Sequence, residues 1–247
     1  MNMVDFQKEI LKTIHRAKAG DIGLSLAYAD LIHALYLGED NGKRLLNYDP
    51  EKPQSEKRDY VVLSNKAVWP TLSVILRQAG FLLEEREAFS LKISGVEAVT
   101  GLPGAGLSIA WGMAQSLHIS KKSNRVYVFL DEDDLSVGQV WEAAMGIAYD
   151  RLDNLVGICA YTGCSKLEPL QDKFEAFGWK VIKLVDGHSE AEIVEAIVKT
   201  KDVKRQPTLI LAPTILGKGI PFAEGKQQYR GVLFSETEMK EAQQFLK

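Results

Sequence analysis

An apolar strand, a run of acids, a helix and a second apolar strand follow one another between residues 125 and 160. The first strand is expected over 125–130, where apolar residues do not strictly alternate with polar ones, as is typical of a parallel strand covered on both faces. Four consecutive acids, Asp131 to Asp134, come directly after it. Ligands of an open parallel α/β sheet lie at the carboxyl ends of its strands, so we expect a functional site at this acidic turn.

Strand and helix patterns also alternate along the rest of the chain. This alternation predicts an α/β fold, with a doubly wound, mostly parallel sheet that has helices on both faces. A chain of 247 residues can bury a large core, and we expect a single domain over residues 1–247. The other expected strands cover 58–64, 180–184 and 208–212, and the expected helices include one that ends at Gly20, one that begins near Ser25, and those over 107–117, 137–149, 190–199 and 236–245.

Charge and hydropathy exclude several classes of partner. The net charge is −3 and the pI is about 5.9, so no basic surface for nucleic acid is expected. The sequence contains no apolar run of the length that spans a membrane, and it has no charged and then apolar leader. We therefore expect no nucleic-acid partner, no membrane partner and a cytoplasmic location.

The two cysteines, Cys159 and Cys164, stand five positions apart around the end of an expected strand. No further cysteine or paired histidine joins them in the spacing of a zinc site. Disulfides are rare in intracellular proteins, so the expectation is one buried thiol and one loop thiol, both reduced.

The acidic turn has two interpretations from its own residues. Carboxylates are suitable ligands for calcium or magnesium. Four adjacent side chains cannot all converge on one ion if the strand continues, however, and the spacing of a calcium-binding loop is absent. A solvated turn that caps the following helix is the favoured interpretation, because acids near a helix N-terminus interact well with its dipole.

Three motifs resemble the diphosphate-binding half of transketolase and related thiamine diphosphate enzymes. They are Gly-Gln-Val-Trp-Glu-Ala-Ala at 138–144, Ala-Phe-Gly-Trp at 176–179, and the Thr-x-x-Gly-Lys-Gly pattern at 214–219. The resemblance spans nearly the whole chain and implies the thiamine diphosphate-binding fold. It also implies thiamine diphosphate and Mg²⁺ as the cofactors of the family. Transketolases have two further domains, which arrive on a second polypeptide in split versions.

The resemblance places Glu132 at the metal-binding aspartate of the family and Thr162 at its metal-binding asparagine. Glu132 and Thr162 are therefore the candidate metal and cofactor residues. Magnesium demands near-ideal octahedral geometry, for which a longer acid and a hydroxyl are poor substitutes. Asp131 and Asp133 stand where the family has glycines. Two like charges about 4 Å apart cost on the order of 4 kcal/mol at an effective dielectric of about 20, so these carboxylates disfavour a diphosphate.

Gly101, Gly104 and Gly106 match the family's loop over the diphosphate and are further candidate cofactor residues. Glycines let backbone N–H groups approach an anion closely. Leu102 and Pro103 remove a hydroxyl and an N–H group from this loop, which lowers its capacity for phosphate. Packing of the glycine-rich turn against the sheet is the favoured alternative.

At four other positions the resemblance implies a histidine or a glutamate, and this chain has a different residue. Asp21, Ala67 and Arg230 stand at three histidine positions, and Val137 stands at a glutamate position. Asp21 is expected to cap a helix, and Arg230 is expected to face solvent, although arginine can bind an anion. His188 is the one histidine retained in a family motif, and we expect it to stabilise a turn by a hydrogen bond.

Two hypotheses about function follow from the resemblance. The first is a transketolase N-terminal-like subunit without catalytic residues, which binds no cofactor by itself and forms a homodimer or binds a separate transketolase C-terminal subunit. The helix over 137–149 is where we expect subunit contact. The alternative is the N-terminal subunit of a two-chain, thiamine diphosphate-dependent transferase that moves a ketol unit.

Overall fold

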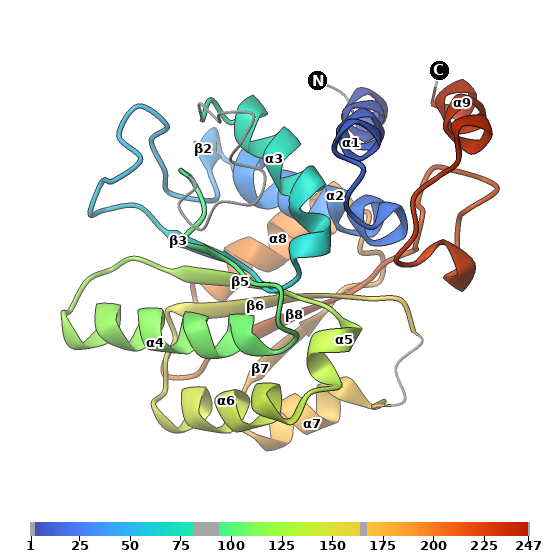
Figure 1. The fold of residues 1–247 in the computed structure, drawn as a ribbon. Coiled ribbons are helices and arrows are strands. Elements are labelled where there is room, and N and C mark those ends of the chain that lie inside the picture. Colours follow the sequence, from blue (N-terminus) through green and yellow to red (C-terminus); the bar gives the residue numbers. More distant parts are fainter. Residues whose placement is uncertain (1–2, 82–93, 164–166, 247) are drawn as a thin grey trace.

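The computed structural model describes residues 3–81, 94–163 and 167–246. In this part of the chain, parallel strands form a six-stranded sheet in the order β4-β3-β5-β6-β8-β7 (Figure 1). The strands are β3 (Tyr60–Leu63), β4 (Ala98–Val99), β5 (Val126–Leu130), β6 (Leu155–Tyr161), β7 (Lys180–Lys183) and β8 (Thr208–Pro213). A short antiparallel pair, β1 (Glu39–Asp40) and β2 (Lys43–Arg44), lies outside this sheet. The predicted doubly wound, mostly parallel sheet is confirmed.

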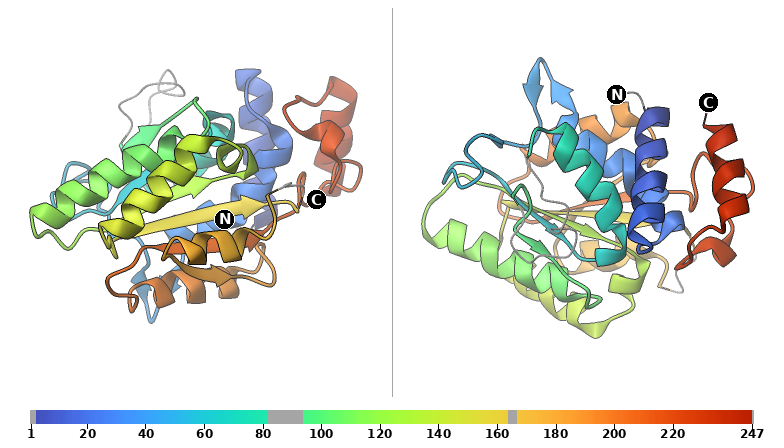
Figure 2. Two further views of the ribbon diagram at one scale, coloured as in Figure 1. Left: turned by 90° about the horizontal axis from the view of Figure 1, so that it is seen from below. Right: turned by 45° about the horizontal axis from the view of Figure 1, so that its top comes forward.

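Helices cover both faces of the sheet, as predicted. One face carries α1 (Met3–Ala17), α2 (Ile22–Leu37), α3 (Trp69–Gln78) and α8 (Glu190–Thr200), whereas α4 (Ala105–Ile119), α6 (Gly138–Tyr149) and α7 (Leu170–Ala176) lie on the other (Figure 1). Seen from below, α4 and α6 run side by side (Figure 2). The remaining long helix, α9 (Glu236–Phe245), lies beside α1.

Each face of the sheet has its own apolar core. Phe129, Ile158 and Ile210 belong to the core under α2 and α8, and Val128 and Leu209 belong to the core under α4 and α6. All five side chains are fully buried. The strands are therefore apolar on both faces, which explains their lack of alternation.

Helix α2 is buried around most of its circumference, because it packs against α1, α3, α8 and the sheet. It begins at Ile22, three residues before the predicted start near Ser25. The Asp21 side chain caps it by accepting a hydrogen bond from the backbone N–H of Leu24 at 2.9 Å. The predicted start was too late because it was taken from the apolar pattern and not from the position of Asp21, which was itself predicted to cap a helix.

The strand order reverses between β3 and β5. The chain leaves β3 toward β4 at one edge and leaves β5 toward β6 in the other direction. Such a switch point opens a crevice at the carboxyl ends of the two strands, where doubly wound proteins bind ligands. The acidic turn after β5 therefore lies at the switch point.

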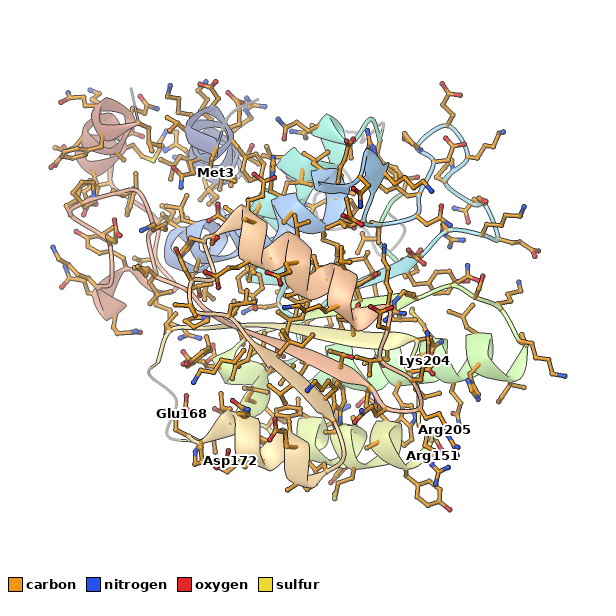
Figure 3. The ribbon with its side chains drawn as sticks, turned by 180° about the vertical axis from the view of Figure 1, so that it is seen from behind. Met3, Arg151, Glu168, Asp172, Lys204 and Arg205 are labelled. Carbon is orange, nitrogen blue, oxygen red and sulfur yellow. The ribbon has the colours of Figure 1, made fainter. Side chains whose placement is uncertain are left out.

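The two ends of the sheet differ in the charges around them. Arg151, Lys204 and Arg205 lie before β6 and β8, at the amino end, and Glu168 and Asp172 lie beyond β6 at the opposite end (Figure 3). Glu168 and Asp172 thus lie at the same end of the sheet as the acidic turn.

Two further sequence predictions concern the cysteines and membranes. Cys159 is a buried free thiol, as expected, and Cys164 lies outside the described residues. Among the residues that the structure describes, no helix has the length and apolarity needed to cross a membrane.

Candidate functional site

The acidic turn is a short helix, α5 (Glu132–Leu135), that closes on itself through a capping box. Asp131 accepts hydrogen bonds from the backbone N–H groups of Asp133 and Asp134 at 2.9 and 3.0 Å, and Asp134 accepts one from the N–H of Asp131 at 3.0 Å. Asp131 and Asp134 are each only 1% exposed and Glu132 is 6% exposed. The prediction of a solvated turn was therefore wrong. The acids were also expected to cap the helix over 137–149, but α6 begins after Val137 and has no side-chain cap, whereas Asp131 caps the short helix α5, which was not predicted.

Residues from β3 and from the glycine loop fill the switch point. Ser64 donates to Oδ1 of Asp134 at 2.6 Å, and the backbone N–H of Gly104 donates to the same oxygen at 2.7 Å. Asn65 donates to Oδ2 of Asp131 at 2.7 Å. With the capping box, all four carboxylate oxygens of Asp131 and Asp134 accept hydrogen bonds. A pocket of about 50 Å³ remains over this cluster.

Burial controls the ionisation of these two acids. Desolvation raises the pKa of Asp131, although the hydrogen bond from Asn65 opposes the shift. Desolvation, followed by the charge of Asp131, raises the pKa of Asp134 to about 6. Carboxylates shifted in this direction bind a proton more readily than ordinary ones.

The structure brings together the two candidate metal residues. Thr162, after β6, donates to Oε2 of Glu132 at 2.7 Å. Nη1 of Arg230 lies 3.7 Å from the same oxygen, and Nη2 lies 2.8 Å from Oδ2 of Asp133. The Arg230 side chain is 21% exposed. The prediction that Arg230 faces solvent was therefore wrong, because it did not take account of the acids at the end of β5.

Asp21 has a structural role at the histidine position that it occupies. One carboxylate oxygen caps α2, and the other accepts a hydrogen bond from the backbone N–H of Gly231 at 2.7 Å. Desolvation raises its pKa against the effect of these hydrogen bonds. The predicted cap is confirmed, and Asp21 also holds the C-terminal segment.

The three candidate glycines have close packing contacts. A Cβ atom on Gly106 would lie 2.5 Å from Cβ of Ser64, and one on Gly101 would lie 2.8 Å from the Lys66 side chain. Gly104 has φ of +80°, a left-handed conformation that L-residues rarely adopt. The packing alternative therefore accounts for Gly106, backbone conformation accounts for Gly104, and Gly101 contacts only the flexible end of Lys66.

His188 is held between two elements. Its Nε2 accepts the backbone N–H of Ile215 at 2.9 Å, so its Nδ1 carries the proton that bonds Oδ2 of Asp30 at 2.6 Å. The predicted stabilising hydrogen bond is confirmed.

A diphosphate and its dication do not fit this arrangement. The N–H of Gly104 already binds Asp134, and the N–H of Leu102 binds Oγ1 of Thr100 at 3.0 Å. These are donors that a loop needs to hold phosphate. The side of Glu132 that faces Thr162 is also beside a guanidinium. In the described part of the chain, no group of three or more His, Cys, Asp or Glu side chains is arranged to hold a metal ion.

Sequence reasoning missed the roles of Ser64 and Asn65, which bind the two buried acids. Both follow directly after β3, in the same way that the acidic turn follows β5. The signal was available, because the carboxyl ends of neighbouring parallel strands meet at one edge.

The parallel sheet and the site at its switch point define a doubly wound α/β protein of the class that binds ligands at the carboxyl ends of its strands. The family model described as "Transketolase, thiamine diphosphate binding domain" matches residues 8–246, and the chain belongs to this family. Among solved structures, transketolase from Leishmania mexicana superposes with a TM-score of 0.87 at 19% identity and covers 100% of this chain. Transketolase from Campylobacter jejuni gives a TM-score of 0.85 at 24% identity, also over 100% of this chain. The chain spans 41% and 43% of those two proteins.

Two curated relatives of similar length are named as transketolase subunits. "6-deoxy-6-sulfo-D-fructose transketolase subunit SqwG" from Clostridium sp. strain MSTE9 is 33% identical over 96% of this chain and 91% of its own length. An apulose-4-phosphate transketolase subunit from Phocaeicola vulgatus is 29% identical over 89% of this chain and 83% of its own length. This chain is thus a homologue of proteins that are named as transketolase subunits.

Proposed function

We propose that this chain is a partner-binding subunit of a transketolase-like assembly and that it has no catalytic role of its own. In this proposal it binds neither thiamine diphosphate nor Mg²⁺ in the manner of its family. Its role is to bind a second polypeptide through the surface of its thiamine diphosphate-binding fold.

The observation that carries this proposal is the pairing of Glu132. One of its oxygens accepts a hydrogen bond from Thr162 at 2.7 Å and lies 3.7 Å from Nη1 of Arg230. The two candidate metal residues therefore bind each other beside an internal cation. A metal ion bound between Glu132 and Thr162 would have to break the hydrogen bond from the Thr162 hydroxyl and also displace the Arg230 guanidinium.

Electrostatics favour the same conclusion for the diphosphate. Asp131, Glu132 and Asp134 are buried within the turn, and Asp133 lies at its surface. A contact between like charges near 4 Å costs on the order of 4 kcal/mol at an effective dielectric of about 20. Binding a diphosphate would add at least one such contact and would also break the hydrogen bond from Gly104 to Asp134.

Proton transfer at this site would need a suitable acid or base. Asp21 has both carboxylate oxygens engaged by backbone N–H groups, and Ala67 has no titratable group. Arg230 stays protonated at ordinary pH, so it cannot act as a general base. These three side chains, at the family's histidine positions, support a role without catalysis.

The partner in this proposal is a separate C-terminal transketolase chain, because the two relatives of similar length carry subunit names. A second copy of this chain is the other candidate. Helix α6 exposes Met145 and Tyr149, which are 50% and 87% exposed, and this apolar surface favours protein contact.

Calorimetry tests the proposal directly. The purified chain is titrated with thiamine diphosphate and MgCl₂, first alone and then with a C-terminal transketolase chain encoded beside it. We expect a heat of association when the two chains are mixed. We expect no saturable binding of thiamine diphosphate at micromolar concentrations, either to this chain alone or to the two chains together. Saturable micromolar binding that depends on Glu132 would overturn the proposal, and a Glu132→Gln variant provides that control.

The second candidate function is the N-terminal subunit of an active two-chain, thiamine diphosphate-dependent transferase. The names of the same two relatives favour it, since both are transketolase subunits. Ketol transfer by the two-chain mixture, absent when either chain is omitted, would establish this candidate in place of the first.

A further inference from the structure

A loop that comes late in the chain reaches the acidic turn and places a cation on it. The segment after η3 (Gln227–Tyr229) carries Arg230, whose guanidinium lies 3.7 Å from Oε2 of Glu132 and 2.8 Å from Oδ2 of Asp133. Glu132 comes from the end of β5, which is nearly one hundred residues earlier in the chain. One guanidinium therefore joins two carboxylates of α5 to the C-terminal segment.

The backbone on both sides of Arg230 is anchored. Gly231 donates its N–H to Asp21 at 2.7 Å. The Tyr229 ring packs edge-on between Phe222 and Phe234, with ring centroids 5.7 and 5.5 Å away. These contacts fix the backbone on both sides of Arg230 independently of α5, so that the arginine starts from a defined position beside the acidic turn.

The contact with Arg230 also stabilises the negative charge of Glu132, which is buried. Glu132 is only 6% exposed, and a buried carboxylate without a nearby cation is strongly disfavoured. Asp131 and Asp134, on either side of it in the turn, add negative potential. A guanidinium that contacts two carboxylates lowers this potential while remaining a fixed part of the chain.

We propose that Arg230 is a built-in counter-cation that occupies the space beside Glu132 and Thr162 and thereby excludes a divalent metal ion. Metal binding and the seated guanidinium are mutually exclusive at this position. This inference deepens the proposed function and rests on it, because it assigns the exclusion of the metal ion to one residue and predicts that one substitution reverses the effect.

The test measures binding of Mn²⁺ to the full chain by the loss of its free-ion EPR signal, without thiamine diphosphate. The wild type, Arg230→Gln and Arg230→Gln with Glu132→Gln are compared. We expect Arg230→Gln to bind Mn²⁺ with a dissociation constant at least about tenfold lower than that of the wild type, because the carboxylates lose their competing cation. The double variant is expected to return to the wild-type value.

Thermal unfolding supplies a second readout. MnCl₂ is expected to raise the Tm of Arg230→Gln and to leave the Tm of the wild type unchanged. If Arg230→Gln is unfolded without metal, MnCl₂ is expected to fold it. The inference is wrong if Arg230→Gln binds Mn²⁺ no more tightly than the wild type, or if the ion fails to raise its Tm. Because no cofactor is present, these outcomes are independent of the calorimetric test of the proposed function.

Discussion

Nδ1 of His188 lies 2.6 Å from Oδ2 of Asp30, although the two residues are 158 positions apart in the sequence. His188 follows β7 and Asp30 lies within α2, so the contact joins the carboxyl end of the sheet to the helix layer above it. Nε2 of the same ring accepts the N–H of Ile215 after β8. One imidazole thus connects three elements.

The first prediction concerns this connection. His188→Ala leaves the Asp30 carboxylate and the Ile215 N–H without their partner, and the Asp30 side chain is only 10% exposed. We expect a loss of about 3 kcal/mol in the free energy of unfolding, measured by urea denaturation. His118→Ala, at an exposed position on α4, is the matched control and is expected to change stability by less than about 0.5 kcal/mol. Equal stability of the two variants would contradict the prediction.

The second prediction compares two glycines of the same helix. A Cβ atom on Gly106 would meet the backbone of Ser64 at 2.8 Å, whereas one on Gly112 has nothing within 4 Å. Gly106→Ala is expected to cost about 2 kcal/mol through overpacking. Gly112→Ala is expected to stabilise α4 by up to about 1 kcal/mol. Urea denaturation of both variants measures the difference, and the prediction fails if the two shifts have the same sign.

The third prediction concerns the pH dependence of stability. Desolvation and the charge of Asp131 raise the pKa of Asp134 from 3.8 to about 6. Between these values the folded state holds a proton that the unfolded state has released, so the contribution of this group to stability falls as the pH rises. We expect the free energy of unfolding of the wild type, relative to Asp134→Asn, to decrease by about 2 to 3 kcal/mol between about pH 4 and 6.

Denaturation curves at several pH values check this expectation. Asp172→Asn, at an exposed position of α7, is the control and is expected to follow the wild type across the interval. A constant difference between wild type and Asp134→Asn would show that the buried carboxyl does not titrate there.

The fourth prediction separates the two roles of Asp21, which caps α2 and binds Gly231. Asp21→Ser retains a capping oxygen but lacks a second acceptor. We expect Asp21→Ala to lower the free energy of unfolding by about 1 kcal/mol, and we expect Asp21→Ser to lower it by much less, because serine still caps α2. Both variants are expected to lose protection of the Gly231 amide in hydrogen exchange. Retained protection in Asp21→Ser would mean that the loop is held without this carboxylate.

The fold was predictable because its signals are local and repeated. The apolar strand predicted over 125–130 and the helix predicted over 236–245 were recognisable from their own residues, and the observed bounds, Val126–Leu130 and Glu236–Phe245, agree closely. The start of α2 was predicted too late, since it was read from the apolar pattern, although Asp21 had been recognised as a helix cap. The parallel order of the strands followed from the alternation of strands and helices.

The site was less predictable because its contacts are between distant parts of the chain. Glu132 and Thr162, which the resemblance placed at one metal site, lie in contact at the ends of adjacent strands, and their role as metal ligands stays a prediction. Asp131 and Asp134 accept hydrogen bonds from Asn65 and Ser64, which carry no charge and were detectable only from their position after the neighbouring strand β3. The position of Arg230 depends on the course of a long loop, which periodicity does not describe.

The close approach of α4 to β3 has a consequence for how relatives of this chain are sorted. Gly106 is required there because Ser64 lies against it, whatever the protein binds. Divergent family members will therefore keep this glycine under selection for stability, and its retention does not distinguish active enzymes from inactive relatives. The pair formed by an acid after β5 and an arginine after η3 is the more informative marker for that purpose.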